Sequence, residues 1–259
     1  MTRWMRTFAF VGLAVAVAGC AGDADPAADA AAEPETAVAE TPPDETSETP
    51  AADEPAGDPT AATGDDVNPL MNPTDPSMNE QAPATFRARF VTSEGPFIVE
   101  FHRAWAPLGV DRVYNLIEAG FYDGVRFFRV LDGFVAQFGI HGDPAIQARW
   151  RGANIVDDPV VEGNTRGRVT FAMGGPNTRS TQLFINYVDN SQLDGMGFPA
   201  LGEVVEGMDV VEQLYSGYGE GPPRNPAGPN QSLIQQRGNE YLNAEFPELD
   251  YIESAEIIG

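Results

Sequence analysis

The sequence predicts a mainly β domain over residues 86–259, built as a closed barrel or a sandwich. Apolar and polar residues alternate over short stretches, which is the pattern of half-buried strands. Further short apolar runs are separated by glycine, proline, asparagine and aspartate. Only two amphipathic helical segments lie among these runs. Because closing a sheet of short strands on itself removes its exposed edges, a closed arrangement is favoured.

The first elements of the domain are a hairpin and a helix. Residues 86–90 alternate phenylalanine and alanine with arginine, and residues 97–101 alternate again after a Gly-Pro pair. This pattern predicts two strands joined by a turn. Pro107, apolar residues at helical spacing and a closing Gly120 predict an amphipathic helix over 107–120.

Short strands dominate the middle of the domain. Apolar runs bounded by turn-forming residues predict strands over 125–131, 134–140, 169–173, 183–187 and 201–205. Residues 208–215 have the apolar spacing of a helix, and residues 249–258 read as a last strand. The predicted order is therefore a hairpin, a helix, several strands, a second helix and a final strand.

The charge of the chain excludes one class of function. The 259 residues include 39 acidic and 15 basic side chains, which gives a formal net charge of -24. Nucleic-acid-binding proteins neutralise phosphates with clusters of lysine and arginine. The basic residues here are all arginines and form no such cluster. We therefore expect no nucleic-acid partner.

The amino terminus has the features of an export signal. Arg3 and Arg6 precede an apolar run over 8–18, which ends in small residues directly before Cys20. This order is typical of a secretory signal peptide, and the run is too short for a membrane-spanning helix, which takes about 20 apolar residues. The position of Cys20 resembles the lipidation site of bacterial lipoproteins. We expect a signal peptide over 1–19 and an exported, membrane-anchored lipoprotein of the cell envelope, with an ordinary secretory signal and a bystander cysteine as the alternative.

Residues 20–85 are expected to form a disordered tether between the lipid anchor and the domain. Residues 21–85 contain 16 acidic residues, no basic residue and 11 of the 22 prolines, with few large apolar side chains. Such a composition cannot bury a core, and proline and like-charge repulsion keep the chain extended. The folded domain is therefore expected to begin at residue 86.

Several sequence blocks resemble the cyclophilin family of peptidyl-prolyl cis-trans isomerases. Residues 127–137 read FFRVLDGFVAQ, with an arginine, a phenylalanine and a glutamine at the spacing of that family's signature. The other blocks follow in the family's order at 171–178 (FAMGGPNT), 181–185 (TQLFI), 193–195 (LDG) and 202–208 (GEVVEGM). The resemblance covers about residues 86–215. It implies a closed eight-stranded antiparallel barrel capped by two helices, in agreement with the strands and helices read above.

The resemblance also implies an activity, which is rotation about Xaa-Pro peptide bonds. Amide resonance opposes this rotation with a barrier of about 18 to 20 kcal/mol. An enzyme can hold the proline in an apolar pocket and donate a hydrogen bond to the prolyl nitrogen as the bond twists. Arginine suits this role because it stays charged and carries several donors in a rigid fork. By resemblance, the catalytic residues are Arg129 and Gln137, and the substrate-binding residues are Phe134, Ala172, Met173, Gln182, Phe184, Leu193 and Phe198.

Two departures from the family pattern bear on ligands. Gln192 stands where many cyclophilins have a tryptophan, so weak binding of cyclosporin-type ligands is expected. Phe198 stands where the family's pocket histidine falls and keeps that wall apolar. We expect proline-containing polypeptides as partners and a monomeric protein. No cofactor or metal is expected, because His102 and His141 have neither a cysteine partner nor a paired-histidine helix.

The connection before the last strand is longer than is usual in the family. Residues 217–230 are rich in glycine and proline and predict a stiff irregular loop. Residues 231–246 then predict an additional helix. We expect this helix to cover the barrel surface, with a lid near the site as the alternative.

Two functions from different classes remain open beside each other. The first is an isomerase that assists the folding of exported proteins. The second is a proline-peptide-binding or scaffolding module in the envelope that has exchanged turnover for affinity. The intact Arg129 and Gln137 favour the isomerase, because a pure binder has less need of a buried cationic donor.

Overall fold

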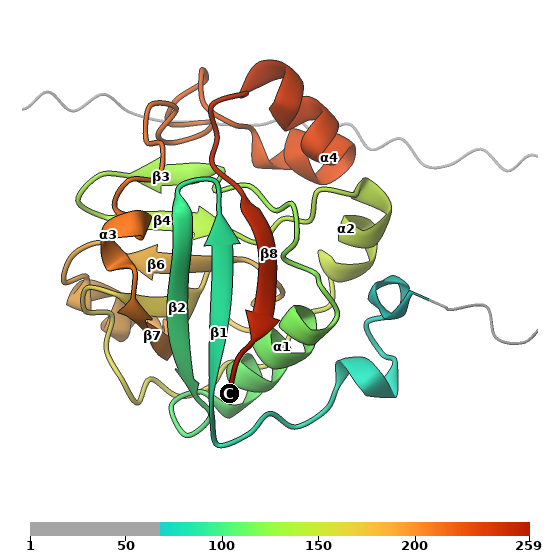
Figure 1. Cartoon of the computed structure of the whole chain (residues 1–259), viewed down its shortest axis with the longest axis vertical. Helices are drawn as coiled ribbons and strands as arrows, with labels where there is room; N and C mark the ends of the chain where they lie inside the picture. Colours follow the sequence, from blue (N-terminus) through green and yellow to red (C-terminus); the bar gives the residue numbers. More distant parts are fainter. Residues whose placement is uncertain (1–67) are drawn as a thin grey trace, which may run out of the picture. The chain divides into compact units, whose positions relative to one another are not determined.

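One antiparallel sheet of eight strands forms the body of the protein. The computed structural model describes residues 68–259, and Figure 1 shows the strands curling around a common core. The strands are β1 (Thr85–Thr92), β2 (Gly95–His102), β3 (Arg129–Leu131), β4 (Val135–Phe138), β5 (Arg168–Phe171), β6 (Leu183–Asn186), β7 (Ala200–Glu206) and β8 (Ile252–Ile257). Their order across the sheet is β3-β4-β6-β5-β7-β2-β1-β8. The predicted signal peptide, Cys20 and the linker up to residue 67 lie outside the described residues.

The mainly β class is as predicted, but the sheet does not close by a continuous ladder. β3 and β8 stand at its two ends. Between these ends, Arg126 and Tyr251 form an isolated bridge, and the Phe127 N–H donates to the Asp250 carbonyl at 2.9 Å. β3 has only three residues, although the apolar run had predicted a strand from residue 125. Because this strand is too short to pair along β8, the sheet is a curled half-barrel and not the closed barrel that was expected.

β1 and β2 form the hairpin that the alternation predicted. Phe86, Ala88 and Phe90 are buried, while the arginines between them are exposed. The register pairs Thr92 with Gly95 across a tight turn. Phe90 stacks on Phe97 with ring centroids 5.1 Å apart, so this hairpin brings its apolar face into the core.

Four α-helices of the described residues surround the sheet: α1 (Pro107–Glu118), α2 (Pro144–Trp150), α3 (Met208–Val211) and α4 (Gln231–Glu245). α1 packs against β8, α3 against β2 and α2 against α4, as Figure 1 shows. α1 and α4 confirm predicted helices, and α3 is shorter than the predicted 208–215. α2 was not predicted, although Asp143 caps it and Pro144 begins it, which is a common signature of a helix start.

The folded unit begins before residue 86. Two short 3-10 helices, Pro69–Met71 and Pro76–Met78, bring Leu70 and Met78 into the main core. The indole N–H of the buried Trp150 in α2 donates to the Leu70 carbonyl at 2.8 Å. The predicted disorder is therefore wrong for residues 68–85. The acidic, proline-rich composition hid a few apolar side chains that are enough to dock this segment.

α4 forms a second apolar cluster with residues that lie next to β3 and β4 in the chain. Ile234, Tyr241 and Leu242 of the helix are buried with Phe128 and Ile140. The helix kinks at a glycine with a positive φ of 56°. A Cβ on that glycine would lie 1.9 Å from the Gly142 carbonyl oxygen, so only glycine allows α4 to approach the chain this closely. The covering helix confirms the expectation for residues 231–246.

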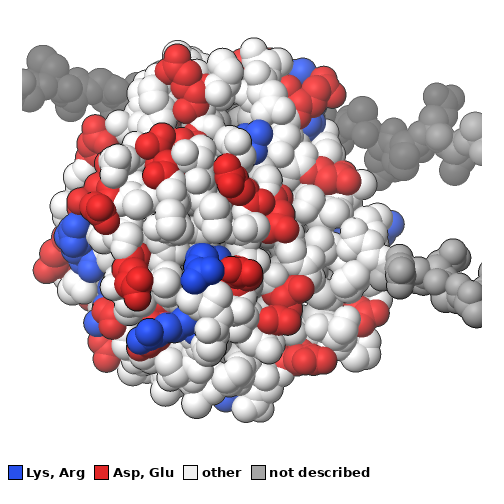
Figure 2. All heavy atoms as spheres, in the orientation of Figure 1, with Lys and Arg blue, Asp and Glu red and all other residues white. Residues whose placement is uncertain are grey.

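The surface of the described residues is acidic and carries dispersed arginines. Figure 2 shows the face over β1, β2 and β8, where acidic side chains surround the few basic ones. The Arg87–Glu100 pair at 2.7 Å and the Arg89–Glu256 pair at 3.2 Å are examples of arginines paired with carboxylates. No helix within residues 68–259 has the length and apolar character that a membrane crossing needs.

Candidate active site

Arg129, Gln137 and Gln182 are joined in one chain of side-chain hydrogen bonds. An Arg129 Nη1–H donates to Gln137 Oε1 at 3.1 Å, and Gln137 Nε2 donates to Gln182 Oε1 at 2.9 Å. The Arg129 side chain is 15% exposed and Gln137 is 8% exposed. The structure therefore brings together three residues that the sequence assigned to one site, and Arg129 and Gln137 are largely buried there.

The strand register explains why these side chains share a face. Arg129 in β3 lies directly opposite Gln137 in β4, and Gln137 lies opposite Phe184 in β6. Directly opposed residues of antiparallel strands point to the same side of the sheet. Their chain neighbours Val130 and Ala136 belong to the main core. Since side chains alternate along a strand, the row through Arg129, Gln137 and Phe184 faces away from that core.

An apolar hollow opens beside this row. Its volume is about 380 Å³ and its lining residues are Arg129, Phe134, Val135, Gln137, Ala172, Met173, Phe184, Leu193, Met196, Phe198 and Arg224. Phe184 meets Phe198 edge to face at 6.0 Å between ring centroids. The Arg129 guanidinium carbon lies 5.8 Å from the centre of the Phe134 ring. A cationic donor thus stands at the rim of a pocket of aromatic walls, which suits a small apolar ring.

All of the predicted pocket-wall residues line this hollow, and three of its residues were not predicted: Val135, which lies inside the family signature, Met196 and Arg224. Phe134, Phe184, Leu193 and Phe198 had been assigned to it by resemblance. Met196 belongs to the 3-10 helix Ser191–Met196 and is 63% exposed. Arg224 comes from the loop before α4. Neither Met196 nor Arg224 lies in a stretch that carries the family signature, so the resemblance could not point to them.

Two further hollows flank the pocket and share lining residues with it. One is about 490 Å³ and includes Met196 and Phe198, and the other is about 350 Å³ and includes Gln137 and Gln182. Met173 lines both of them as well as the central pocket. The three hollows therefore form one groove, long enough for residues on both sides of a bound proline.

The backbone beside the pocket is only partly available to a peptide. The Ala172 N–H donates to the Gln182 carbonyl at 2.9 Å. This hydrogen bond occupies the Ala172 donor, so a bound peptide can meet only the carbonyl of that residue. Met173 lines all three hollows of the groove.

A carboxylate from a distant loop holds the other edge of Arg129. Arg129 Nε–H donates to Glu220 Oε1 at 2.6 Å, and an Nη2–H donates to Glu220 Oε2 at 2.8 Å. The Arg129 hydrogen bond, more than any other contact, holds the pKa of Glu220 below its ordinary value, although partial burial opposes the shift. Sequence reasoning missed Glu220, because nothing in the glycine- and proline-rich loop indicates which way it folds.

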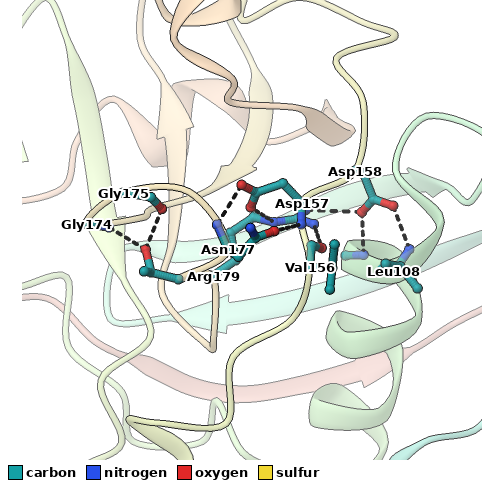
Figure 3. Close-up of polar contacts among 10 residues, drawn as sticks. Leu108, Val156, Asp157, Asp158, Gly174, Gly175, Asn177 and Arg179 are labelled. Atoms are coloured by element: carbon teal, nitrogen blue, oxygen red, sulfur yellow. Dashed lines mark hydrogen bonds and ion pairs between the residues drawn. The ribbon is translucent and has the colours of Figure 1, made fainter.

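A buried arginine fixes the loop that forms one side of the groove (Figure 3). Arg179 is 0% exposed and donates to Asp157 and Asp158, each at 3.1 Å, and to the Val156 carbonyl. Asp158 also accepts the N–H groups of Leu108 at 3.0 Å and Gly109 at 2.8 Å. These are the first turn of α1, where unpaired N–H groups favour an anion.

The same loop is cross-linked by a second set of bonds. Asp157 N–H donates to Asn177 Oδ1 at 2.9 Å, and Asn177 N–H donates to Asp157 Oδ2 at 2.7 Å. Thr178 Oγ1 accepts the Gly174 N–H at 2.9 Å and donates to the Gly175 carbonyl at 2.7 Å. Since Gly174 and Gly175 line the groove, these bonds hold its wall in place.

Residues 68–259 contain no group of three or more histidine, cysteine, aspartate or glutamate residues that could hold a metal ion. His141 Nδ1 accepts the Asp143 N–H at 2.9 Å, as a hydrogen-bonded loop histidine does. Burial lowers the pKa of His141 from its ordinary value. The groups found at the site are Arg129 and Arg224, the Glu220 carboxylate, glutamines and apolar side chains.

Sequence comparisons with known proteins agree on one family. A sequence profile described as cyclophilin type peptidyl-prolyl cis-trans isomerase/CLD matches residues 87–230. A peptidyl-prolyl cis-trans isomerase of Schizosaccharomyces pombe is 35% identical over 130 residues, which are 48% of this chain and 81% of that protein. A probable peptidyl-prolyl cis-trans isomerase of Brucella abortus is 33% identical over 135 residues, or 48% of this chain and 68% of that protein. A crystal structure of a Cryptosporidium parvum cyclophilin type isomerase aligns with a TM-score of 0.49 at 20% identity, over 68% of this chain and 98% of that chain.

Proposed function

The chain belongs to the cyclophilin family of peptidyl-prolyl cis-trans isomerases, and from that premise we propose that Arg129 carries the catalysis. The protein accelerates rotation about Xaa-Pro peptide bonds. The observation that supports the role of Arg129 is its position, with hydrogen bonds on two edges and an apolar pocket beside it. The mechanism follows from what that geometry can do to a twisting amide.

Catalysis of this reaction requires no covalent step. Rotation about the peptide bond is opposed by a resonance barrier of about 18 to 20 kcal/mol. When the bond twists, the prolyl nitrogen becomes pyramidal and its electron pair can accept a hydrogen bond. An enzyme lowers the barrier by interactions that are stronger in this twisted state than in either planar isomer. A preorganised donor in a site with little water supplies such an interaction.

Arg129 has donors left for a substrate after its contacts within the protein. A guanidinium has five N–H groups. One on Nε, one on Nη1 and one on Nη2 are taken by Glu220 and Gln137. One N–H on each terminal nitrogen remains. With the proline ring held between Phe134, Phe184, Leu193 and Phe198, these donors reach the prolyl nitrogen and the neighbouring carbonyl.

The groove on both sides of the pocket binds the rest of the peptide. Gln137 and Gln182 provide amide groups on one side, and Met173 lines both flanking hollows. The exposed Gln192, which lies in the 3-10 helix beside the pocket, supplies no large apolar wall. Binding of cyclosporin-type ligands is therefore weak in this proposal. The protein acts as a monomer on unfolded or surface-exposed polypeptides.

The proposed place of action is outside the cytoplasm, on a lipid anchor at Cys20. Arg3 and Arg6, the apolar run over 8–18 and the small residues before Cys20 support this part of the proposal. Labelling cells with a palmitate analogue tests it. The full chain is expected to take up the label and Cys20→Ser is not. Export of an unlabelled full chain would instead favour an ordinary secretory signal.

The test of the activity is an exchange measurement on a short Xaa-Pro peptide with the purified full chain. Exchange between the cis and trans signals in NMR spectra is expected to accelerate in proportion to the protein concentration, and an excess of a second proline peptide is expected to suppress it. Binding of the peptide without faster exchange would support the binding or scaffolding module instead.

A further inference from the structure

Glu220 reaches Arg129 from a loop that is itself firmly held. The loop over residues 217–230 connects α3 to α4, and Tyr218 packs edge to face on Phe246 with ring centroids 5.0 Å apart. Asn225 Nδ2 donates to the Tyr218 carbonyl at 3.3 Å, and the Asn225 N–H donates to the Gly221 carbonyl at 3.2 Å. Glu220 is thus bracketed by contacts that fix where its carboxylate stands.

The Glu220 carboxylate both balances the charge of the Arg129 guanidinium and fixes its orientation. Both carboxylate oxygens accept a hydrogen bond, from Nε and Nη2, at 2.6 and 2.8 Å. Two parallel bonds between a planar fork and a planar carboxylate fix the plane of the guanidinium, which one bond alone would leave free to turn. The bond to Gln137 at 3.1 Å then fixes the third nitrogen.

We propose that Glu220 is a positioning residue for catalysis, which orients the guanidinium of Arg129 so that its remaining N–H groups face the proline pocket. This inference rests on the proposed catalytic role of Arg129. A donor that is already oriented loses little freedom when the substrate binds and meets the twisted bond without rearrangement. The inserted loop, absent from the family signature that predicted the rest of the site, thereby becomes part of the catalytic arrangement.

A second arginine, Arg224, also lies next to the Glu220 carboxylate. Arg224 Nη1 lies 3.5 Å from Glu220 Oε2, and Arg224 also lines the proline pocket. The Glu220 carboxylate therefore lies between two guanidinium groups. Without it, Arg129 and Arg224 would face each other as like charges, and Arg129 would be pushed away from its catalytic position.

A surface pair elsewhere in the chain shows what a merely structural contact looks like. Arg166 donates to one oxygen of Glu212 from Nε at 3.0 Å and from Nη2 at 2.7 Å. The side chains of Arg166 and Glu212 are 53% and 44% exposed. Those of Arg129 and Glu220 are only 15% and 24% exposed. Exposed pairs contribute little to stability. Glu212 lies away from the pocket lining, so Glu212→Gln is a matched control.

The experiment compares Glu220→Gln, Glu220→Asp and Glu212→Gln with the unmodified full chain, with kcat and KM measured separately by peptide exchange. Glutamine has the same size, but its amide N–H₂ group would face an arginine donor. Because a small misplacement of a catalytic group costs up to about 100-fold in rate, we expect kcat of Glu220→Gln to fall about tenfold with KM little changed. Aspartate keeps both oxygens and is expected to restore part of kcat. Glu212→Gln is expected to behave as the unmodified chain.

A spectroscopic signature separates orientation from general structural damage. The Nε–H signal of Arg129 in a 15N-1H spectrum, assigned by its loss in Arg129→Lys, is expected to be sharp and shifted in the unmodified chain. In Glu220→Gln it is expected to broaden, while the signals of distant residues stay in place and the urea midpoint falls only slightly. An unchanged or increased kcat in Glu220→Gln overturns the proposal. If the unmodified chain fails to accelerate exchange, the proposed activity fails instead, which is a different result.

Discussion

Two of the arginines that pair with carboxylates, Arg179 and Arg129, differ in which of their N–H groups remain free. Arg179 is fully buried, contacts Asp157 and Asp158, and donates its other terminal nitrogen to a backbone carbonyl. Arg129 has one carboxylate partner, remains 15% exposed and borders a hollow of about 380 Å³. The first arginine is surrounded by acceptors from its own chain. The second is held on two edges and left open on a third.

The difference shows that an arginine–carboxylate contact can serve either stability or catalysis. Around Arg179, Asp158 also accepts two N–H groups from the first turn of α1, so the network joins a helix to the groove wall. Removing any member leaves charge or donors buried without a partner. Around Arg129, open N–H groups face the pocket and can act on a substrate. The buried network should therefore control stability, and the open one should control rate.

The largest expected effect is on stability, at the buried arginine. Arg179→Met removes the cation and leaves the carboxylate of Asp158, whose side chain is 3% exposed, without its charge partner. Breaking a buried pair in this way typically costs about 3–5 kcal/mol of unfolding free energy. Urea denaturation measures the loss.

A surface pair provides the control for this comparison. Arg166→Met removes a cation that is 53% exposed, and the change is expected to stay within about 1 kcal/mol. If both variants lost the same unfolding free energy, burial would not explain a special role of the Arg179 network in stability. The contrast between the buried and the open arginine would then be wrong.

A smaller loss is expected where the helix approaches the buried network. A Cβ on Gly109 would lie 2.6 Å from Leu201 Cδ2 and 3.1 Å from Arg179 Nη1. Gly109→Ala therefore forces neighbours in a packed core to move, which typically costs about 1–3 kcal/mol. Gly133→Ala is not a fair control because of its positive φ, whereas Gly152→Ala is, since open space surrounds it. An unchanged urea midpoint in Gly109→Ala would mean that the network tolerates displacement.

The smallest effect concerns pH and belongs to the open pair. The pKa of Glu220 is lowered mainly by its hydrogen bond from Arg129. A carboxyl with a lowered native pKa stabilises the fold above its unfolded pKa, about 4.3 for glutamate, and this contribution is lost as the pH falls through the native value. We expect the stability difference between the unmodified chain and Glu220→Gln to stay constant from pH 7 to 5 and to shrink at lower pH. A difference that grows on acidification would contradict this sign.

Local patterns predicted most of the elements and short-range features of the fold. Alternation over residues 86–101 gave the β1–β2 hairpin, and helical spacing with Pro107 and Gly120 gave α1. α2 escaped notice because it has only seven residues and a single apolar turn. The docking of Leu70 against Trp150 was not predicted, because it depends on a buried contact between residues 80 positions apart in sequence and not on local composition.

The residues of the site likewise fall into those that the sequence predicted and those that it did not. The family resemblance predicted Arg129, Gln137 and the pocket walls, and the register of β3, β4 and β6 brings them together. Glu220 is 91 residues from Arg129 in sequence and lies in a loop whose path no local pattern specifies. Long-range contacts of that kind depend on how the whole loop packs, here through Tyr218 against Phe246. Sequence patterns therefore predicted the core of the site but not the group that holds its arginine.

The most direct test of the account is Arg129→Ala in the full chain, with peptide exchange and urea denaturation measured on the same preparation. Loss of a preorganised transition-state donor typically costs about 100-fold or more in rate. We expect kcat/KM for Xaa-Pro exchange to fall by about that factor, while the variant stays folded and keeps a cooperative urea transition. An Arg129→Ala variant that keeps most of its exchange activity, or one that loses activity only because it unfolds, would contradict the claim that Arg129 carries the catalysis.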